Sequence, residues 1–343
     1  LILQQNLNKQ PDLFIQISIP NEFQPIGKYN IGITAGIETT LPSGAFIEGL
    51  NRMNLNLVTS KHVKKVFEDA SYAKKFEDGR QEPLKSEKPI EVCFWGADTK
   101  IYKKTEEKIE SIEKVMERIP EKFAFLFIGQ WTHRNTFHDR KDIGNLIKTF
   151  SNAFKDKSPD NRPCLILKTS GVTFSAIDRD EILAKIKEAQ SQIDGVCPNV
   201  YLLHGELSPV EMNGLMNHEK VKVHVSFTHG EGYGHPLLLS TLSGKPLLSS
   251  NWSGHLDFLK YATLLPGEVK QIHPSAVVQN MLLPESSWFT VDYKRAGDVL
   301  EEVYKNYNKT LDWAKKQSYI SKTEFSLEKM SEKLNQIIDE KVP

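Results

Sequence analysis

A short turn around Glu231 carries the residues best suited to chemistry. Three glycines and a carboxylate lie within five positions, Gly230-Glu231-Gly232-Tyr233-Gly234, and His235-Pro236 follow them. Proline is favoured in the first turn of a helix, so the spacing predicts a turn at a helix N-terminus. Free backbone N–H groups there favour a phosphate, and glycine lets a ligand approach closely. A carboxylate suits such a site only if it meets a neutral part of the ligand, such as sugar hydroxyls. The turn therefore predicts a nucleotide-sugar pocket.

The same stretch carries a family resemblance. Gly230-Glu231-Gly232-Tyr233-Gly234-His235-Pro236-Leu237-Leu238, with Ser243-Gly244-Lys245-Pro246 after it, resembles the donor-site signature of GT-B glycosyltransferases of family 4. The resemblance implies an α/β protein with two Rossmann-like, doubly wound parallel-sheet domains and a cleft between them. In that family a second glutamate, eight positions after the first, typically hydrogen-bonds the nucleotide ribose. Leu239 holds that position here, and neighbouring Ser240 is a weak substitute.

The resemblance also assigns roles to particular residues. Lys141 matches the family lysine that holds the donor diphosphate, while the matching arginine is Arg140 or its competitor Arg134, because the loop 130–142 is longer than usual. Glu231 would contact the donor sugar, which makes Glu231, Lys141 and Arg140 the expected catalytic group. The further residues expected at the donor are Gly129, Lys168, Thr169, Glu206, Leu207, His229, Gly230, Gly232, Tyr233, Gly234, His235 and Ser240.

The function implied is that of a metal-independent, retaining transferase. It would move a hexosyl group from a UDP- or GDP-sugar to a glycan or another hydroxyl acceptor, with no cofactor. Two unit charges about 4 Å apart attract by about 4 kcal/mol at an effective dielectric near 20, so two cations beside a departing diphosphate would offset much of its charge. Two alternatives share the donor pocket. One is a GT-B epimerase or hydrolase, which needs an acid and a base at the sugar, and the other is a binding module without turnover.

A metal site is the weaker interpretation of the acidic and histidine motifs. Asp178-Arg179-Asp180 matches the Asp-x-Asp pattern with which other sugar transferases hold a divalent ion. Both aspartates precede an apolar segment that starts at Glu181, where helix caps and first-turn acids are common. His133 and His138 lack cysteines or carboxylates at zinc spacing. We therefore expect no metal.

Composition limits the partners. The 343 residues include 44 Lys and Arg and 44 Asp and Glu, so the net charge is zero and no global field attracts nucleic acid or an anionic membrane. Three cysteines are too few for a disulfide framework and favour a reducing compartment. No run approaches the roughly 20 apolar residues of a spanning helix. The sequence predicts a cytoplasmic protein with no nucleic-acid partner and no transmembrane segment.

Alternating strands and helices would position these residues. Apolar runs predict strands at 12–20, 29–36, 55–60, 89–98, 122–129, 164–168, 200–203, 221–225 and 246–248. Ser60 and Ser208 are predicted helix caps, and Glu38-Thr39-Thr40 are polar groups at the end of a strand, where open α/β sheets bind ligands. The expected domains are 1–118, 119–310 and closing helices 311–343 that cross back to the first domain. The chain starts at Leu1 and lacks the family's opening strand and glycine loop, so we expect the first domain to be incomplete.

Overall fold

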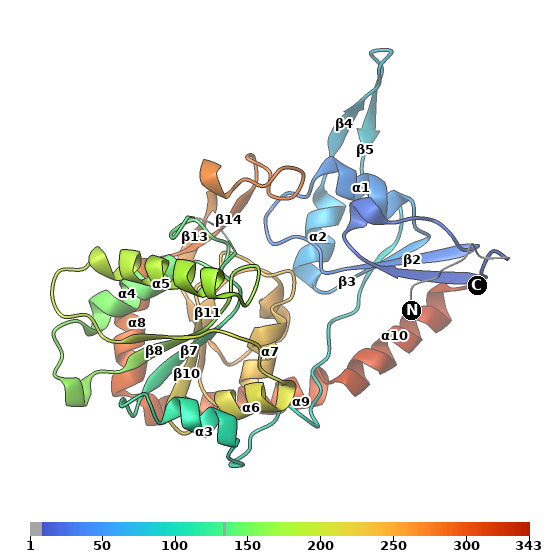
Figure 1. The fold of residues 1–343 in the computed structure, drawn as a ribbon. Coiled ribbons are helices and arrows are strands. Elements are labelled where there is room, and N and C mark those ends of the chain that lie inside the picture. Colours follow the sequence, from blue (N-terminus) through green and yellow to red (C-terminus); the bar gives the residue numbers. More distant parts are fainter. Residues whose placement is uncertain (1–8, 133–134) are drawn as a thin grey trace.

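The computed structural model describes residues 9–132 and 135–343, and two parallel sheets organise them (Figure 1). The first sheet has four strands in the order β1-β2-β3-β6, and the second has six in the order β12-β11-β10-β7-β8-β9. This arrangement confirms the predicted α/β class with two Rossmann-like sheets. Within the described residues, no helix has the length and apolar character that crossing a membrane requires.

The first sheet is covered on both faces. Its strands are β1 (Leu13–Ile17), β2 (Tyr29–Thr34), β3 (Leu55–Val58) and β6 (Ile90–Val92), and its helices are α1 (Gly44–Asn51) and α2 (Lys61–Asp69). Phe46, Val63 and Phe67 from these helices form one buried cluster. On the other face, Ile31 and Leu55 pack against the C-terminal helix α10 (Leu327–Lys341). Figure 1 shows α10 lying beside this sheet.

The second sheet is parallel throughout, with β7 and β10 at its centre. Every residue of β8 is buried, as expected for a parallel strand with helices on both faces. The elements around it are β7 (Ala124–Ile128), α4 (Ile143–Phe154), β8 (Cys164–Lys168), α5 (Ala176–Ser191), β9 (Val200–Leu203), α6 (Pro209–Asn217), β10 (Val221–Ser226), α7 (His235–Thr241), β11 (Leu247–Ser250) and β12 (Thr263–Leu265). The other helices of this half of the chain are α3 (Glu110–Met116), α8 (Tyr293–Lys305) and α9 (Tyr307–Glu324).

Several elements were not predicted. The hairpin of β4 (Tyr72–Lys75) and β5 (Gln81–Leu84) projects from the first sheet in Figure 1, and β13 (Gly267–Gln271) pairs with β14 (Ser287–Val291) in a second antiparallel ribbon. Both predicted caps are confirmed: Ser60 Oγ accepts from Val63 N, and Ser208 forms a capping box with Glu211. The domain limits 1–118, 119–310 and 311–343 stay predictions.

The two sheets meet through loops at their carboxyl ends. Ser60 Oγ donates to Gly232 O at 2.6 Å, and Lys61 N donates to Asp257 Oδ2 at 2.8 Å. Thr40 N donates to Ser287 O at 2.9 Å. The first bond holds the start of α2 against the glycine-rich turn, and the other two join the first half of the chain to segments after β11 and at β14. The predicted site therefore lies where the two halves of the chain touch.

Candidate functional site

Sheet order brings the two halves of the site together. Strands β7 and β10 are hydrogen-bonded neighbours, so the loops that follow them, 129–142 and 227–234, leave the same edge of the sheet. His229 N donates to Arg140 O at 2.8 Å and joins the loops directly. The predicted cations and the predicted carboxylate are therefore adjacent in space.

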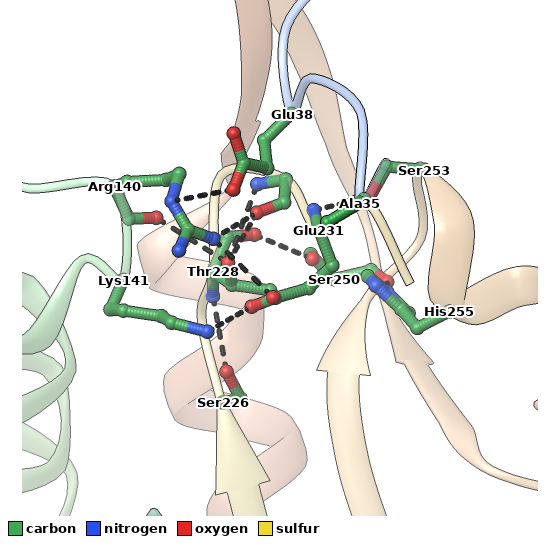
Figure 2. A network of polar contacts seen from close by, with 12 residues as sticks. Ala35, Glu38, Arg140, Lys141, Ser226, Thr228, Glu231, Ser250, Ser253 and His255 are labelled. Carbon is green, nitrogen blue, oxygen red and sulfur yellow. Dashed lines mark hydrogen bonds and ion pairs between the residues drawn. The ribbon is translucent and has the colours of Figure 1, made fainter. Parts of the chain in front are cut away.

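Glu231 lies between the two cations. Its Oε1 is 2.5 Å from Lys141 Nζ, and its Oε2 is 3.3 Å from Arg140 Nη1. Arg140 Nη1 also donates to Gly230 O at 2.8 Å. Figure 2 shows the three side chains converging, with Arg140 and Lys141 coming from one loop and Glu231 from the other. The structure thus brings together the whole expected catalytic group.

Burial and charge together set the state of Glu231. Its side chain is 8% exposed, which disfavours the ionised form, but Lys141 and Arg140 outweigh that cost and lower the pKa of Glu231 to about 2. Burial lowers the pKa of Lys141, although Glu231 opposes this. A carboxylate held ionised accepts hydrogen bonds from hydroxyls but has no proton to donate.

The main chain of the turn is held from the opposite side by the segment after β11. Glu231 N donates to Ser253 Oγ at 2.9 Å, and Gly254 N donates to Glu231 O at 2.9 Å. A Cβ on Gly230 would lie 2.1 Å from Glu38 O, and one on Gly232 would lie 2.2 Å from Ala35 O. Glycine is required at both positions because the loop from the first sheet presses on the turn.

A buried cluster of polar side chains packs against the loop that carries Arg140 and Lys141. Asp139 Oδ2 accepts from Lys141 N at 3.0 Å, while Asp142 accepts from Asn145 Nδ2 at 2.7 Å and from the Tyr293 hydroxyl at 2.8 Å. Burial, to which Asp142 adds repulsion, raises the pKa of Asp139 to about 7. Burial likewise raises the pKa of Asp142 to about 7. Sequence patterns did not predict this cluster, because neither carboxylate belongs to a recognisable motif.

His229, expected at the donor, belongs to the same support. Its ring stacks on Trp288 with centroids 4.3 Å apart, and Nδ1 is 2.6 Å from Phe289 O. Nε2 lies 3.6 Å from Asp142 Oδ1. Burial lowers the pKa of His229 to about 4, so the ring is neutral and donates to the Phe289 carbonyl. Protein groups thus face both ring nitrogens, and donor contact by His229 stays a prediction.

A second group of predicted residues lies along the same edge of the sheet, beginning beside Lys141. A Cβ on Gly129 would lie 3.6 Å from Lys141 Cε, and Gly129 N donates to Lys168 O at 3.2 Å. Lys168 Nζ in turn donates to Gly205 O at 2.5 Å. Lys168, Gly205 and Leu207 border a cavity of about 250 Å³ that α3 and β9 complete. Thr169 is buried beside Lys168, and Glu206 is exposed.

The remaining predicted residues that the structure describes contact other parts of the protein. Tyr233 is 3% exposed, and its ring packs on Phe258 with centroids 5.1 Å apart. Ser240 Oγ donates to Pro236 O at 2.9 Å within its own helix, and Leu239 packs in the adjoining apolar cluster. His235 Nε2 is 3.3 Å from Gly96 O, and Gly234 caps α7 with φ of +89°. Arg134 lies outside the described residues.

Asp178 and Asp180 lie at the start of α5, and this helix begins earlier than predicted. It begins at Ala176 with Ser175 as cap, so both aspartates lie inside its first turns. Asp178 accepts from Gly171 N at 2.9 Å and lies 2.9 Å from His204 Nε2, while Asp180 pairs with Arg179. In the described part of the chain, no group of three or more His, Cys, Asp or Glu residues could hold a metal ion.

Sequence reasoning missed one ionic partner at the site. Glu38 follows β2 on the first sheet, and its Oε1 lies 3.4 Å from Arg140 Nε. Glu38 was expected at the end of a parallel strand, where open α/β sheets bind ligands. No sequence pattern indicated that it pairs with Arg140.

Comparisons with known proteins identify the fold. No family model and no curated sequence matches the chain. Among solved structures, HepE of Anabaena in complex with UDP and glucose matches with a TM-score of 0.62 at 15% identity, over 91% of this chain and 72% of that one. Sucrose-phosphate synthase of Thermosynechococcus elongatus matches with a TM-score of 0.63 at 11% identity, over 96% and 73%. α,α-Trehalose-phosphate synthase of Burkholderia xenovorans in complex with glucose-6-phosphate gives 0.61 at 10%, over 96% and 74%. Across nearly its whole length, the chain has the GT-B fold of these glycosyltransferases.

Proposed function

We propose that the protein is a metal-independent, retaining glycosyltransferase that moves a hexosyl group from a UDP- or GDP-sugar to a glycan or another hydroxyl acceptor. The observation that carries this proposal is the convergence of Glu231, Lys141 and Arg140 at the sheet edge that faces the other lobe of a GT-B fold. The solved complexes of HepE with UDP and with UDP-glucose support a uridine donor.

In this proposal the two cations serve the leaving group. The bond between the anomeric carbon and the diphosphate oxygen breaks, and a bond from the acceptor oxygen to the same carbon forms. The proton of the acceptor hydroxyl passes to the departing diphosphate. Lys141 and Arg140 stabilise the charge that develops on the diphosphate, which is where fixed positive groups in a partly dry site act most strongly. They supply the charge that a divalent ion supplies in other transferases.

Glu231 would hold the sugar. With a pKa of about 2 it is ionised at neutral pH, and its oxygens are strong acceptors for sugar hydroxyls. Glu231 keeps its ion pairs with Lys141 and Arg140, and the remaining lone pairs of its carboxylate accept hydrogen bonds from the hydroxyls of the hexose. The donor would continue past Gly129 and Lys168, placing its nucleoside near Gly205 and Leu207.

The test measures release of UDP or GDP from a panel of nucleotide sugars, with and without hydroxyl acceptors. Glu231→Ala and Lys141→Ala should each reduce turnover by about 100-fold or more, the scale seen when one transition-state contact is removed. Lys187→Ala, on the exposed face of α5, is the matched control and should behave as wild type. Unchanged turnover in both site variants would refute the proposal.

The same panel separates the two alternatives. Binding of a nucleotide sugar without turnover, for any acceptor, would identify a binding module. Release of free sugar, or formation of an isomeric donor without an acceptor, would identify a hydrolase or an epimerase.

A further inference from the structure

Arg140 is shared between carboxylates from the two lobes. Glu231 reaches Nη1 from the glycine-rich turn at 3.3 Å, and Glu38 reaches Nε from the loop after β2 at 3.4 Å. Figure 2 shows Glu38 descending on Arg140 from the loop of the first sheet, on the side away from Lys141. A guanidinium presents a planar fork of donors that suits carboxylates and phosphates alike. The two acids therefore lie against two of the three guanidinium nitrogens that a diphosphate would use.

The two carboxylates differ in how firmly they are held. Glu231 is 8% exposed, pairs with Lys141 as well, and has its main chain fixed by Ser253 and Gly254. The side chain of Glu38 is 28% exposed, and within the described residues its one ionic partner is Arg140. Glu38 can thus turn to water at small cost, while Glu231 cannot.

Charge balance requires that a carboxylate leaves Arg140 when a diphosphate binds. The described cluster holds two cations and two carboxylates, so its charges cancel. A diphosphate brings several more negative charges to a place with little solvent, and like charges in such a place repel strongly. One carboxylate must leave Arg140 before the diphosphate can bind it, and Glu38 is the one with access to water.

We propose that Glu38 competes with the donor diphosphate for Arg140 and thereby sets the affinity for the donor. This inference rests on the proposed function. Donor binding displaces Glu38, and the loop 35–40 then loses its ionic tie to the second lobe. Glu38 is a positioning residue in this scheme, since it acts on the ligand through Arg140.

Calorimetric titration with inorganic pyrophosphate and with UDP tests the proposal. Glu38→Gln should bind both ligands about tenfold more tightly than wild type, an effect of about 1.4 kcal/mol. Glu48→Gln is the control, because Glu48 lies in the same lobe and pairs with Lys74 at 2.8 Å. Its affinities should match wild type. Equal or weaker binding by Glu38→Gln would overturn the inference.

A double-mutant cycle separates competition from simple repulsion. In an Arg140→Ala background, the gain from Glu38→Gln should fall below about twofold, because the shared partner is gone. A gain that persists in full would mean that Glu38 only repels the anion, which contradicts competition for Arg140. Tighter pyrophosphate binding by Glu38→Gln without any sugar transfer would refute the proposed function alone. Transfer activity with unchanged affinities in Glu38→Gln would refute this inference alone.

Discussion

Lys141 Nζ lies 2.5 Å from Glu231 Oε1, although 90 residues separate them in the chain. Both side chains are largely buried, with exposures of 13% and 8%. Their contact depends on the adjacency of β7 and β10, since each residue follows one of these strands. The fold thus creates a closely paired charge cluster where two loops meet, and both stability and ligand binding should respond to changes in it.

Removal of Lys141 should destabilise the protein measurably. Lys141→Met keeps the length of the side chain but leaves Glu231 buried with Arg140 alone, so we expect the free energy of unfolding to fall by about 3 kcal/mol. Urea denaturation measures this change. Lys187→Met on exposed α5 is the control and should stay within about 0.5 kcal/mol of wild type. A Lys141→Met value equal to the control would show that the pair contributes little.

Acid should weaken the same cluster in a defined window. The fold lowers the pKa of Glu231 from its ordinary value of 4.5 to about 2, so folding favours the ionised form. This stability is present above pH 4.5 and is lost as the pH falls toward 2, by roughly 2–3 kcal/mol in all. Glu231→Gln should lack this part of the pH dependence. Parallel stability curves for the two proteins between pH 4.5 and 2 would contradict the assignment.

Asp142 should have the opposite pH dependence. Burial raises its pKa from 3.8 to about 7, so the folded state binds a proton that the unfolded state releases. The resulting stability is complete below pH 3.8 and is lost as the pH rises through 7. Asp142→Asn should therefore gain stability relative to wild type by more than about 1 kcal/mol between pH 4 and pH 8. Asp298→Asn on exposed α8 should show no such trend.

Local patterns predicted most of the elements that position the site. The strands β7, β8, β9 and β10 and the caps Ser60 and Ser208 follow from hydrophobic runs and short cap motifs, which depend on neighbouring residues only. The hairpin β4–β5 was missed because its strands are short and exposed, with lysine, glutamate and proline where apolar alternation would be expected.

The partners of the site residues were harder to predict, since they depend on long-range geometry. Glu38 and Arg140 are about 100 positions apart in the chain, and nothing in either neighbourhood indicates their pairing. His229 and Ser240 lie in or beside the donor signature, yet their polar atoms face Phe289 O and Pro236 O. A motif identifies a turn, but the packing around it decides which side chains remain available to a ligand.

The glycines of the turn should be intolerant of even one methyl group. A Cβ at Gly232 would lie 2.2 Å from Ala35 O, a backbone atom that moves only with its loop. Gly232→Ala should therefore separate the loop 35–40 from the turn, lowering both stability and donor turnover. Gly297→Ala is the control substitution. Gly297 lies inside α8, and the nearest atom to a Cβ there would be 3.7 Å away, an ordinary van der Waals contact. Gly297→Ala should raise the free energy of unfolding by about 0.5–1 kcal/mol, since alanine favours helix interiors.

Ser60 allows the contact between the lobes to be tested apart from helix capping. Its hydroxyl accepts from Val63 N at the start of α2 and donates to Gly232 O at 2.6 Å, so Ser60→Ala removes both bonds. Ser208→Ala removes a cap of the same type from α6 but no contact with the glycine-rich turn.

Both substitutions should therefore cost about 1 kcal/mol of unfolding free energy through the lost cap, and Ser60→Ala should cost about 1 kcal/mol more for the buried carbonyl left without that partner. Only Ser60→Ala should change the affinity for inorganic pyrophosphate, because only its hydroxyl touches the turn that carries Glu231. Equal effects of the two variants on pyrophosphate affinity would mean that Ser60 acts as a cap alone and that the first lobe does not influence the donor site through Gly232.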